Sequence, residues 1–165
     1  TVHTASAIGH LLNWGASAYQ YSDNNGPLGL ITPGNSNNGA PAGQRRPMPA
    51  YFGMKMWTGG DLFRRPSGSM ARVTHSVPDL EVFASTGTKN IVLVNKSPTA
   101  SRTLVVGTGS VTSGQFTVWQ TRAGLETTGT FGGQWAEPTI VRTGAITGDG
   151  IAITVPALTV SCILI

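Results

Sequence analysis

Charged residues are scarce in this chain of 165 residues, where they make up 11% of the sequence, against about 25% in an average soluble domain. Cysteine is almost absent too: Cys162 stands alone, so no disulfide can form within the chain. It lies in the apolar run 158–165, which predicts a buried strand thiol rather than a nucleophile. Hydrophobic residues make up 39% of the sequence and are regularly spaced, which argues against disorder.

No apolar run reaches the roughly eighteen residues that a membrane-spanning helix needs, so a membrane is not an expected partner. Residues 1–4 also lack the charged start and the apolar core of a signal peptide. Low charge, together with 22 glycines and abundant Thr and Ser, is typical of turn-rich, often secreted β proteins. We therefore expect an extracellular protein whose secretion signal lies upstream of this sequence.

Motifs for nucleic acid, metals and cofactors are also missing. The net charge is +4, but the basic residues form no stripe and no helix-turn-helix or zinc-finger pattern, so nucleic acid is not an expected partner. The histidines share no metal-ligand spacing and are interpreted as surface or hydrogen-bonded residues: His3, His10 and His75. No phosphate loop and no G-x-S-x-G elbow occurs, so we expect no cofactor and no serine nucleophile.

The chain changes character near residues 64–66. In the first part, 1–65, Thr4 can cap a helix that Gly15 ends. A strand over 16–22, a Gly/Pro/Asn-rich loop over 24–49 and a second helix over 50–58 follow. The second helix is apolar almost all round, so we expect it to be covered on more than one side. A single strand between helices has two unpaired edges, which indicates the remnant of a larger fold.

The second part, 66–165, has apolar residues at a period of two between Gly, Ser, Thr and Pro turns. The predicted strands are 71–76, 80–85, 90–95, 102–107, 115–121, 139–142, 150–155 and 158–164. Short strands at this spacing are typical of an antiparallel β-sandwich. The predicted fold is therefore mainly β: about eight strands after a helix–strand–loop–helix remnant.

Acidic residues offer no clear catalytic pair, although glycoside hydrolysis needs two carboxylates across a cleft. Asp79 and Glu81 share a face at a strand start, where we expect them to be solvated. The remaining acids, such as Glu126, Glu137 and Asp149, lie in turns, and none is expected to be buried or paired. Asp23 is placed differently, because it follows a strand and opens a long loop, as catalytic-face residues do in a (β/α) barrel; a turn-forming aspartate is the simpler interpretation.

The tryptophans are candidates for core packing or for sugar platforms, because an indole ring stacks on the C–H faces of sugars. Trp119 lies on a predicted strand and can face either way. Trp135 follows Phe131 and two glycines in a loop, a context that favours a platform. Trp14 and Trp57 are expected to pack between a helix and a barrel wall.

A formal glycosylation sequon is present at Asn95-Lys96-Ser97. Pro98 follows it directly and disfavours its use. The sequon also requires a eukaryotic secretory source, so it is a sequence match alone and does not predict a glycan.

Two runs resemble parts of known glycoside hydrolases. Residues 11–23 (LLNWGASAYQYSD), with 29–31 and 49–54, resemble the last helix, eighth strand, loop and final helix of retaining enzymes with a (β/α)₈ barrel. Residues 91–97 and 155–161 are similar to the C-terminal β-sandwich appended to such barrels in xylosidase-, arabinofuranosidase-, endoglucanase- and heparanase-like families. Taken together in their order and spacing, the two runs account for nearly the whole chain.

The resemblance implies that residues 1–65 end a barrel and that 66–165 form its sandwich. In those families the catalytic glutamates end the fourth and seventh barrel strands, and this chain would begin after the seventh. The resemblance therefore assigns no catalytic residue here. Tyr21 and Asp23 match the end of the eighth strand, where side chains line the sugar subsite, although Tyr19-Gln20-Tyr21 replaces a Trp common there.

The leading hypothesis is the C-terminal accessory part of a secreted glycoside hydrolase that acts on plant-type or microbial polysaccharide. By itself it would be inert, and its partners would be carbohydrate and the rest of the barrel, as upstream chain, cleaved fragment or another copy. Substrate contacts are then expected from Tyr21, Asp23, Trp119 and Trp135. The alternatives are a stand-alone carbohydrate-binding module, which needs exposed aromatics on one face, and a purely structural or adhesion sandwich.

Overall fold

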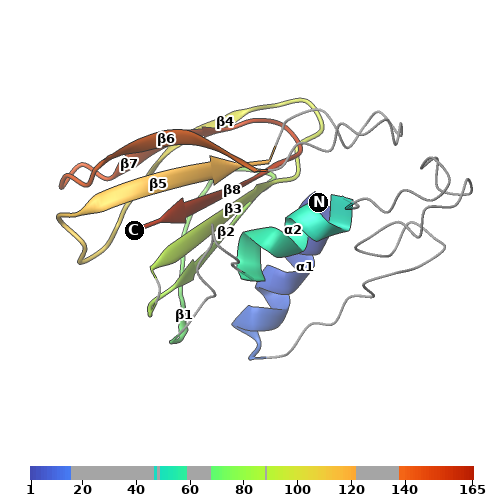
Figure 1. The fold of residues 1–165 in the computed structure, drawn as a ribbon, viewed down its shortest axis with the longest axis horizontal. Coiled ribbons are helices and arrows are strands. Elements are labelled where there is room, and N and C mark those ends of the chain that lie inside the picture. Colours follow the sequence, from blue (N-terminus) through green and yellow to red (C-terminus); the bar gives the residue numbers. More distant parts are fainter. Residues whose placement is uncertain (16–46, 48, 59–67, 88, 122–137) are drawn as a thin grey trace, which may run out of the picture.

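The computed structural model describes residues 1–15, 47, 49–58, 68–87, 89–121 and 138–165. Helices α1 (Val2–Asn13) and α2 (Pro49–Thr58) precede eight antiparallel strands in these residues (Figure 1). The strands are β1 (Met70–Ala71), β2 (Leu80–Ser85), β3 (Asn90–Asn95), β4 (Arg102–Val106), β5 (Gln115–Gln120), β6 (Thr139–Ala145), β7 (Ile151–Val155) and β8 (Thr159–Leu164). The expectation of a mainly β, sandwich-like fold after a helical start is confirmed.

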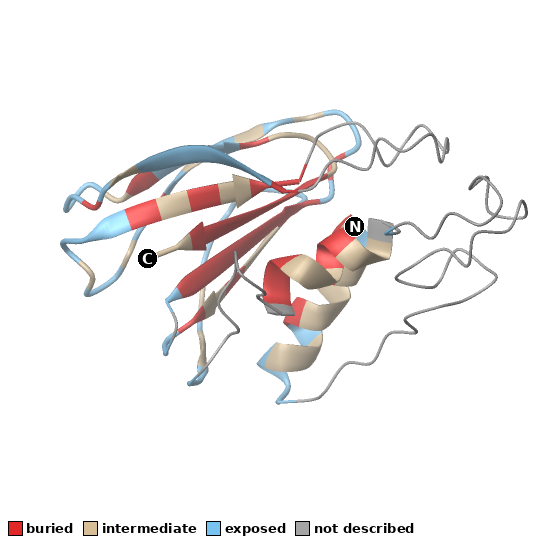
Figure 2. Cartoon of the chain, in the orientation of Figure 1, coloured by how far each residue is buried: buried red, intermediate tan, exposed pale blue. Residues whose placement is uncertain are grey.

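Two sheets of unequal width make up the sandwich. Six strands form one sheet in the order β1-β2-β3-β8-β5-β6, and β4 pairs with β7 in the other. The central strands β3 and β8 are buried on both faces, whereas the edge strand β6 is exposed along most of its length (Figure 2). The wide sheet is therefore a middle layer that is covered on both sides.

Each face of the wide sheet carries its own apolar core. Toward β4 and β7 the buried side chains are Leu80, Ile91, Leu93, Val106, Phe116, Val118, Ile146, Ile151, Ile153, Val155 and Ile163. Toward the helices they are Val2, Ala5, Met56, Trp57, Phe83, Val92, Val94, Val160 and Cys162, here named the helix-side core. Alternation along β2, β3 and β8 sends successive side chains to opposite faces, so both cores share these strands.

The two helices pack against each other and against the sheet at glycine positions. A Cβ on Gly9 of α1 would lie 2.6 Å from the ring of Phe83, and a Cβ on Gly53 of α2 would lie 2.3 Å from the Thr1 carbonyl oxygen. Neither approach is possible for a residue with a side chain. Within this layer α2 is covered by α1 on one side and by the sheet on another, as its apolar sequence predicts.

Some predicted boundaries are wrong. Helix α1 begins at Val2 with Thr1 as its N-cap, not after Thr4. Strand β1 has only two residues, because Met70 and Ala71 alone pair with β2, and the predicted strand 71–76 ends at Ala71. Strand β6 continues to Ala145, beyond the predicted end at 142, because its last residues pair with the start of β5.

The predicted strand over 16–22 lies outside the described residues, as does the predicted loop apart from Pro47 and Pro49. The domain boundary between residues 65 and 66 therefore stays a prediction. Neither described helix is long and apolar enough to cross a membrane.

Candidate functional site

Three of the predicted sugar-contacting residues, Tyr21, Asp23 and Trp135, lie outside the described residues. Trp119 lies on β5, beside a register shift in its pairing with β6. Its side chain is half-buried and packs against the helix-side core. The role of all four as sugar contacts stays a prediction.

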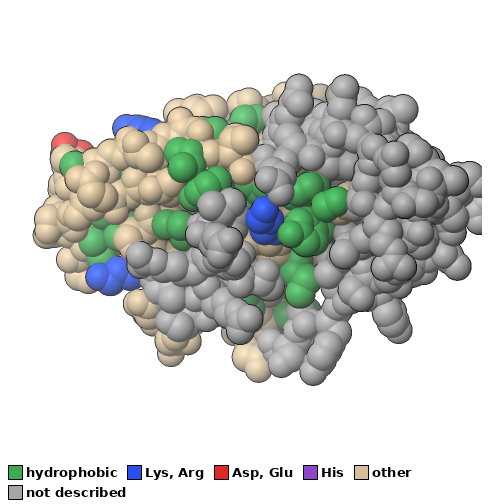
Figure 3. Space-filling view, in the orientation of Figure 1, with side chains coloured by type: hydrophobic (Ala, Val, Ile, Leu, Met, Phe, Trp, Pro, Cys, Tyr) green, Lys and Arg blue, Asp and Glu red, His purple; other side chains and the backbone are tan. Residues whose placement is uncertain are grey.

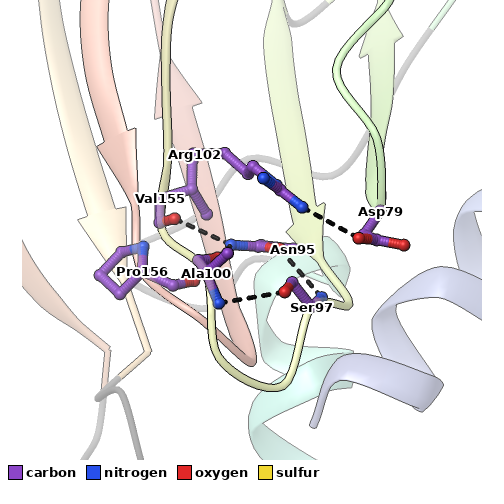
Figure 4. Close-up of polar contacts among 7 residues, drawn as sticks. All are labelled: Asp79, Asn95, Ser97, Ala100, Arg102, Val155 and Pro156. Atoms are coloured by element: carbon purple, nitrogen blue, oxygen red, sulfur yellow. Dashed lines mark hydrogen bonds and ion pairs between the residues drawn. The ribbon is translucent and has the colours of Figure 1, made fainter.

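The Asp79 side chain is exposed, as expected for a solvated carboxylate, but it is also paired. It precedes β2 in a turn with a positive φ of 57°. The Arg102 guanidinium on β4 donates to its carboxylate over 2.9 Å from Nη2 to Oδ2 (Figure 4). Because Arg102 belongs to the narrow sheet, this ion pair links the two sheets at one end of the sandwich.

Glu81 is also paired, and its side chain is only 16% exposed, so the expectation of a solvated strand end is wrong for this residue. Its Oε1 lies 2.6 Å from Lys96 Nζ and 3.2 Å from His10 Nε2. Partial burial raises the pKa of this carboxyl, but hydrogen bonds from Lys96, Ser6 and His10 outweigh that effect. The net pKa lies below its ordinary value of 4.5. Since His10 and Ser6 lie on α1, Glu81 ties that helix to the sheet.

Trp57 and Trp14 differ sharply in burial. Trp57 is 3% exposed, and its indole Nε1 donates to the Ala5 carbonyl oxygen of α1 over 2.9 Å. Its ring meets the Phe83 ring edge-on at 5.7 Å between centroids. Trp57 therefore packs between α1 and the sandwich sheet. Trp14 is 83% exposed, so the expectation that it is packed is wrong.

Asn95 is the most highly connected buried polar side chain among the described residues. Its Nδ2 lies within donor distance of three carbonyl oxygens, those of Ala100 at 2.9 Å, Val155 at 3.0 Å and Pro156 at 2.9 Å. Its Oδ1 accepts from the Ser97 backbone N–H at 3.0 Å (Figure 4). A glycan on Nδ2 would displace these bonds, so the sequon is incompatible with this folded state.

Cys162 is fully buried, as predicted, and desolvation raises the pKa of its thiol to about 12. A thiol in that state is not a nucleophile at neutral pH. Across the described residues no group of three or more His, Cys, Asp or Glu side chains could hold a metal ion.

A groove of about 560 Å³ opens between the wide sheet at β1–β3 and strand β4. It arises because the two strands β4 and β7 do not cover the full width of a six-stranded sheet. Its floor is aliphatic: Val82, Ala84, Ile91, Leu104, Val106, Val111 and Ile165. Exposed polar side chains surround it: Arg72, Thr74, His75, Lys89 and Ser110. A volume of this size falls within the range of about 300–1,000 Å³ that small-molecule sites occupy.

The ionisable side chains that line the groove, among the described residues, are all basic: Arg72, His75 and Lys89. Among the described residues, no Asp or Glu side chain lines the groove. Within the described part of the chain, Arg72, His75 and Lys89 have no hydrogen-bond or ion-pair partner. On the face shown in Figure 3, the described Lys and Arg side chains stand apart from one another. No sequence pattern predicts this site, because only folding brings 72–75, 89 and 104–111 together.

No family model matches the chain, and no curated protein matches it significantly. Solved structures do match. The chain is similar to a glycoside hydrolase family 44 endoglucanase from Clostridium acetobutylicum ATCC 824, with a TM-score of 0.63 and 16% identity. It is similar to a family 51 α-L-arabinofuranosidase from Thermotoga petrophila RKU-1, with a TM-score of 0.63 and 13% identity. A family 30 subfamily 8 xylanase from Clostridium acetobutylicum gives a TM-score of 0.62 and 14% identity.

These alignments cover almost all of this chain but a minor part of the other proteins. They take in 98%, 99% and 98% of this chain and 28%, 37% and 37% of the respective glycoside hydrolases. At such identities the likeness establishes the fold alone. The expected resemblance to glycoside hydrolases is thereby confirmed at the level of fold.

Proposed function

We propose that this chain is the C-terminal accessory part of a secreted glycoside hydrolase that acts on plant-type or microbial polysaccharide. In this proposal residues 1–65 end a (β/α)₈ barrel and residues 66–165 form the sandwich that braces it. The alignments to glycoside hydrolases support it, because they include the helices as well as the sandwich and span 28–37% of those chains.

The observation that carries the proposal is the docking of α1 and α2 on the outer face of the wide sheet. Trp57, Phe83 and Met56 are each at most 3% exposed in this interface. Truncating a buried aromatic side chain of this kind costs about 3–5 kcal/mol. A sandwich that holds helices this firmly on the face opposite its own second sheet is suited to brace a helical layer.

The described acids support a chain that is inert by itself. Asp79 and Glu81 are each held by a cation, and Asp149 lies exposed in a turn. None of the three lines the groove. The catalytic glutamates of the proposed enzyme would then lie upstream of Thr1.

Expression of this chain alone and of the same chain extended through its upstream coding sequence tests the proposal. Reducing-sugar release from xylan, arabinan and β-glucan is the readout. We expect no hydrolysis by the chain alone and hydrolysis of at least one polysaccharide by the extended protein. Hydrolysis by the chain alone, or an upstream sequence without a barrel, would refute the proposal.

The groove favours one alternative, a stand-alone carbohydrate-binding module, because it offers an aliphatic floor and two hydroxyls, of Thr74 and Ser110, that have no partner among the described residues. Calorimetric titration of the chain with soluble glucans and xylans tests this function. A response to any of them in the absence of an upstream barrel supports the module. No response to all of them removes it.

A further inference from the structure

We propose that the groove between β1–β3 and β4 is a binding site for carboxylate-bearing saccharides, that is, for uronic-acid units of a polysaccharide. The ligand class rests on the proposed carbohydrate-related function, and the site itself rests on the lining of the groove. Nothing in the sequence distinguishes these side chains from ordinary surface residues.

The charge of the lining identifies the ligand as an anion. Arg72 and His75 follow β1, and Lys89 precedes β3, so two separate segments bring positive or protonatable groups to one opening. None of the three has a partner within the described residues, and no Asp or Glu side chain lies among them. Like charges without counterions repel one another, so an anion between them is stabilised by all of them.

The backbone of Lys89 has an unusual conformation. Its φ is 55°, in the left-handed region that residues with a Cβ seldom adopt. The strained turn between β2 and β3 therefore presents a lysine at the groove where Gly or Asn would be the ordinary choice.

The remaining lining favours a sugar over a simple inorganic anion. Thr74 and Ser110 offer hydroxyls that are free within the described residues, and the floor between them is aliphatic. A pyranose presents hydroxyls at its rim and C–H groups on its faces, which match these two surfaces. No Trp or Tyr of the described part of the chain lines the groove. A neutral glucan therefore lacks the aromatic platform on which it would stack, whereas a uronate gains charge-assisted bonds instead.

Calorimetric titration of the full chain with tri-galacturonate and with its fully methyl-esterified form tests the proposal. The two ligands share the same sugar backbone and differ at the carboxyl groups, which are charged in the acid and carry neutral methyl esters in the other form. We expect the carboxylate form to bind at least tenfold more tightly at low salt, and the difference to shrink as salt is added. Absence of binding, or equal affinity for acid and ester, would overturn the proposal.

Variants locate the binding. Arg72→Gln should weaken tri-galacturonate binding by roughly threefold to fivefold, as expected for one exposed ion pair. Lys55→Gln removes the same charge from α2, away from the groove, and should leave the affinity unchanged. An equal loss in both variants would mean non-specific attraction to a basic protein and would overturn the site. The proposal would also be overturned if a hexa-glutamate peptide bound as tightly as tri-galacturonate and lost the same affinity in Arg72→Gln. The groove would then be a peptide site.

These outcomes are independent of the hydrolysis assay. If the chain does not bind uronate, the proposed function as a sandwich that braces a barrel is unaffected. Failure of the extended protein to hydrolyse polysaccharide leaves Arg72-dependent binding of uronate measurable in this chain alone.

Discussion

Asn95 holds one end of the sandwich closed. Its side chain is fully buried. Its Nδ2 lies within donor distance of three carbonyl oxygens, and its Oδ1 accepts from one backbone N–H. Asn95→Ala leaves these backbone groups without partners in a site that water does not reach. Each buried unsatisfied group costs about 1–3 kcal/mol, so we expect the free energy of unfolding to fall by roughly 2–4 kcal/mol in urea titrations.

Two further variants separate the hydrogen bonds from general effects of mutation. Asn95→Asp keeps the acceptor oxygen but loses the donors, and it should destabilise the chain at least as much at neutral pH because it buries a charge. Ser113→Ala, in an exposed turn, should change stability by less than about 0.5 kcal/mol. If Asn95→Ala were no worse than Ser113→Ala, the network would contribute nothing to stability.

Glu81 makes the stability of the helix layer depend on pH. Its pKa is depressed in the folded state, so the unfolded chain binds more protons than the folded chain near pH 4.5. The stabilisation is therefore present above the unfolded pKa and is lost as the pH falls through the folded pKa. We expect the urea midpoint of the wild-type chain to drop more steeply below about pH 4.5 than that of Glu81→Gln.

Asp149→Asn is the matched control for this pH dependence. Asp149 is exposed in a turn and has no ion-pair partner in the described residues. Its variant should follow the wild-type pH profile. Superimposable profiles for wild type and Glu81→Gln would show that the carboxylate bonds to Lys96 and His10 do not stabilise the fold.

At the scale of elements, Gly9 sets how closely α1 approaches β2. In an isolated helix Gly→Ala stabilises by about 1 kcal/mol, but here the new Cβ would meet the Phe83 ring at 2.6 Å. We expect Gly9→Ala to destabilise the chain by about 1–3 kcal/mol, as overpacked sites do. In the double variant with Phe83→Leu the added loss should be smaller, and additive losses would contradict the close contact.

The strands were predictable from the sequence because their signal is local. Alternating apolar residues give β2 and β3 at the observed bounds, 80–85 and 90–95. The same pattern over 71–76 misleads, because a strand also needs a partner. Within that segment only Ala71, together with Met70 before it, pairs with β2. Pairing is a property of the sheet, so the length of an edge strand cannot be read from its own residues.

The site contacts were not predictable, because they join distant residues. The partners of Asp79 and Glu81 could not be foreseen, because Arg102 and His10 lie 23 and 71 residues away from them in sequence. The cations of the groove are likewise ordinary surface residues until β1–β3 and β4 come together. Cys162 could be predicted, because a lone thiol within an apolar strand has little alternative to burial.

At the scale of the whole molecule, the helix layer keeps one apolar face of the wide sheet out of water. Phe83, Val92 and Val160 face the helices and are at most 3% exposed. Without α1 and α2, this face would be a contiguous apolar patch, which soluble proteins rarely expose. The layer therefore contributes to the stability of the sandwich.

Cys162 reports the docking of this layer, because it belongs to the helix-side core and is fully buried. A chromogenic disulfide reagent should react with it only when the helices detach. Trp57→Ala removes a buried ring and its bond to the Ala5 carbonyl, a loss of about 3–5 kcal/mol that should speed the reaction at least tenfold. Trp14→Ala deletes an indole that is 83% exposed and should leave the rate unchanged. Equal rates in all three proteins would show that strand separation, not helix docking, exposes the thiol.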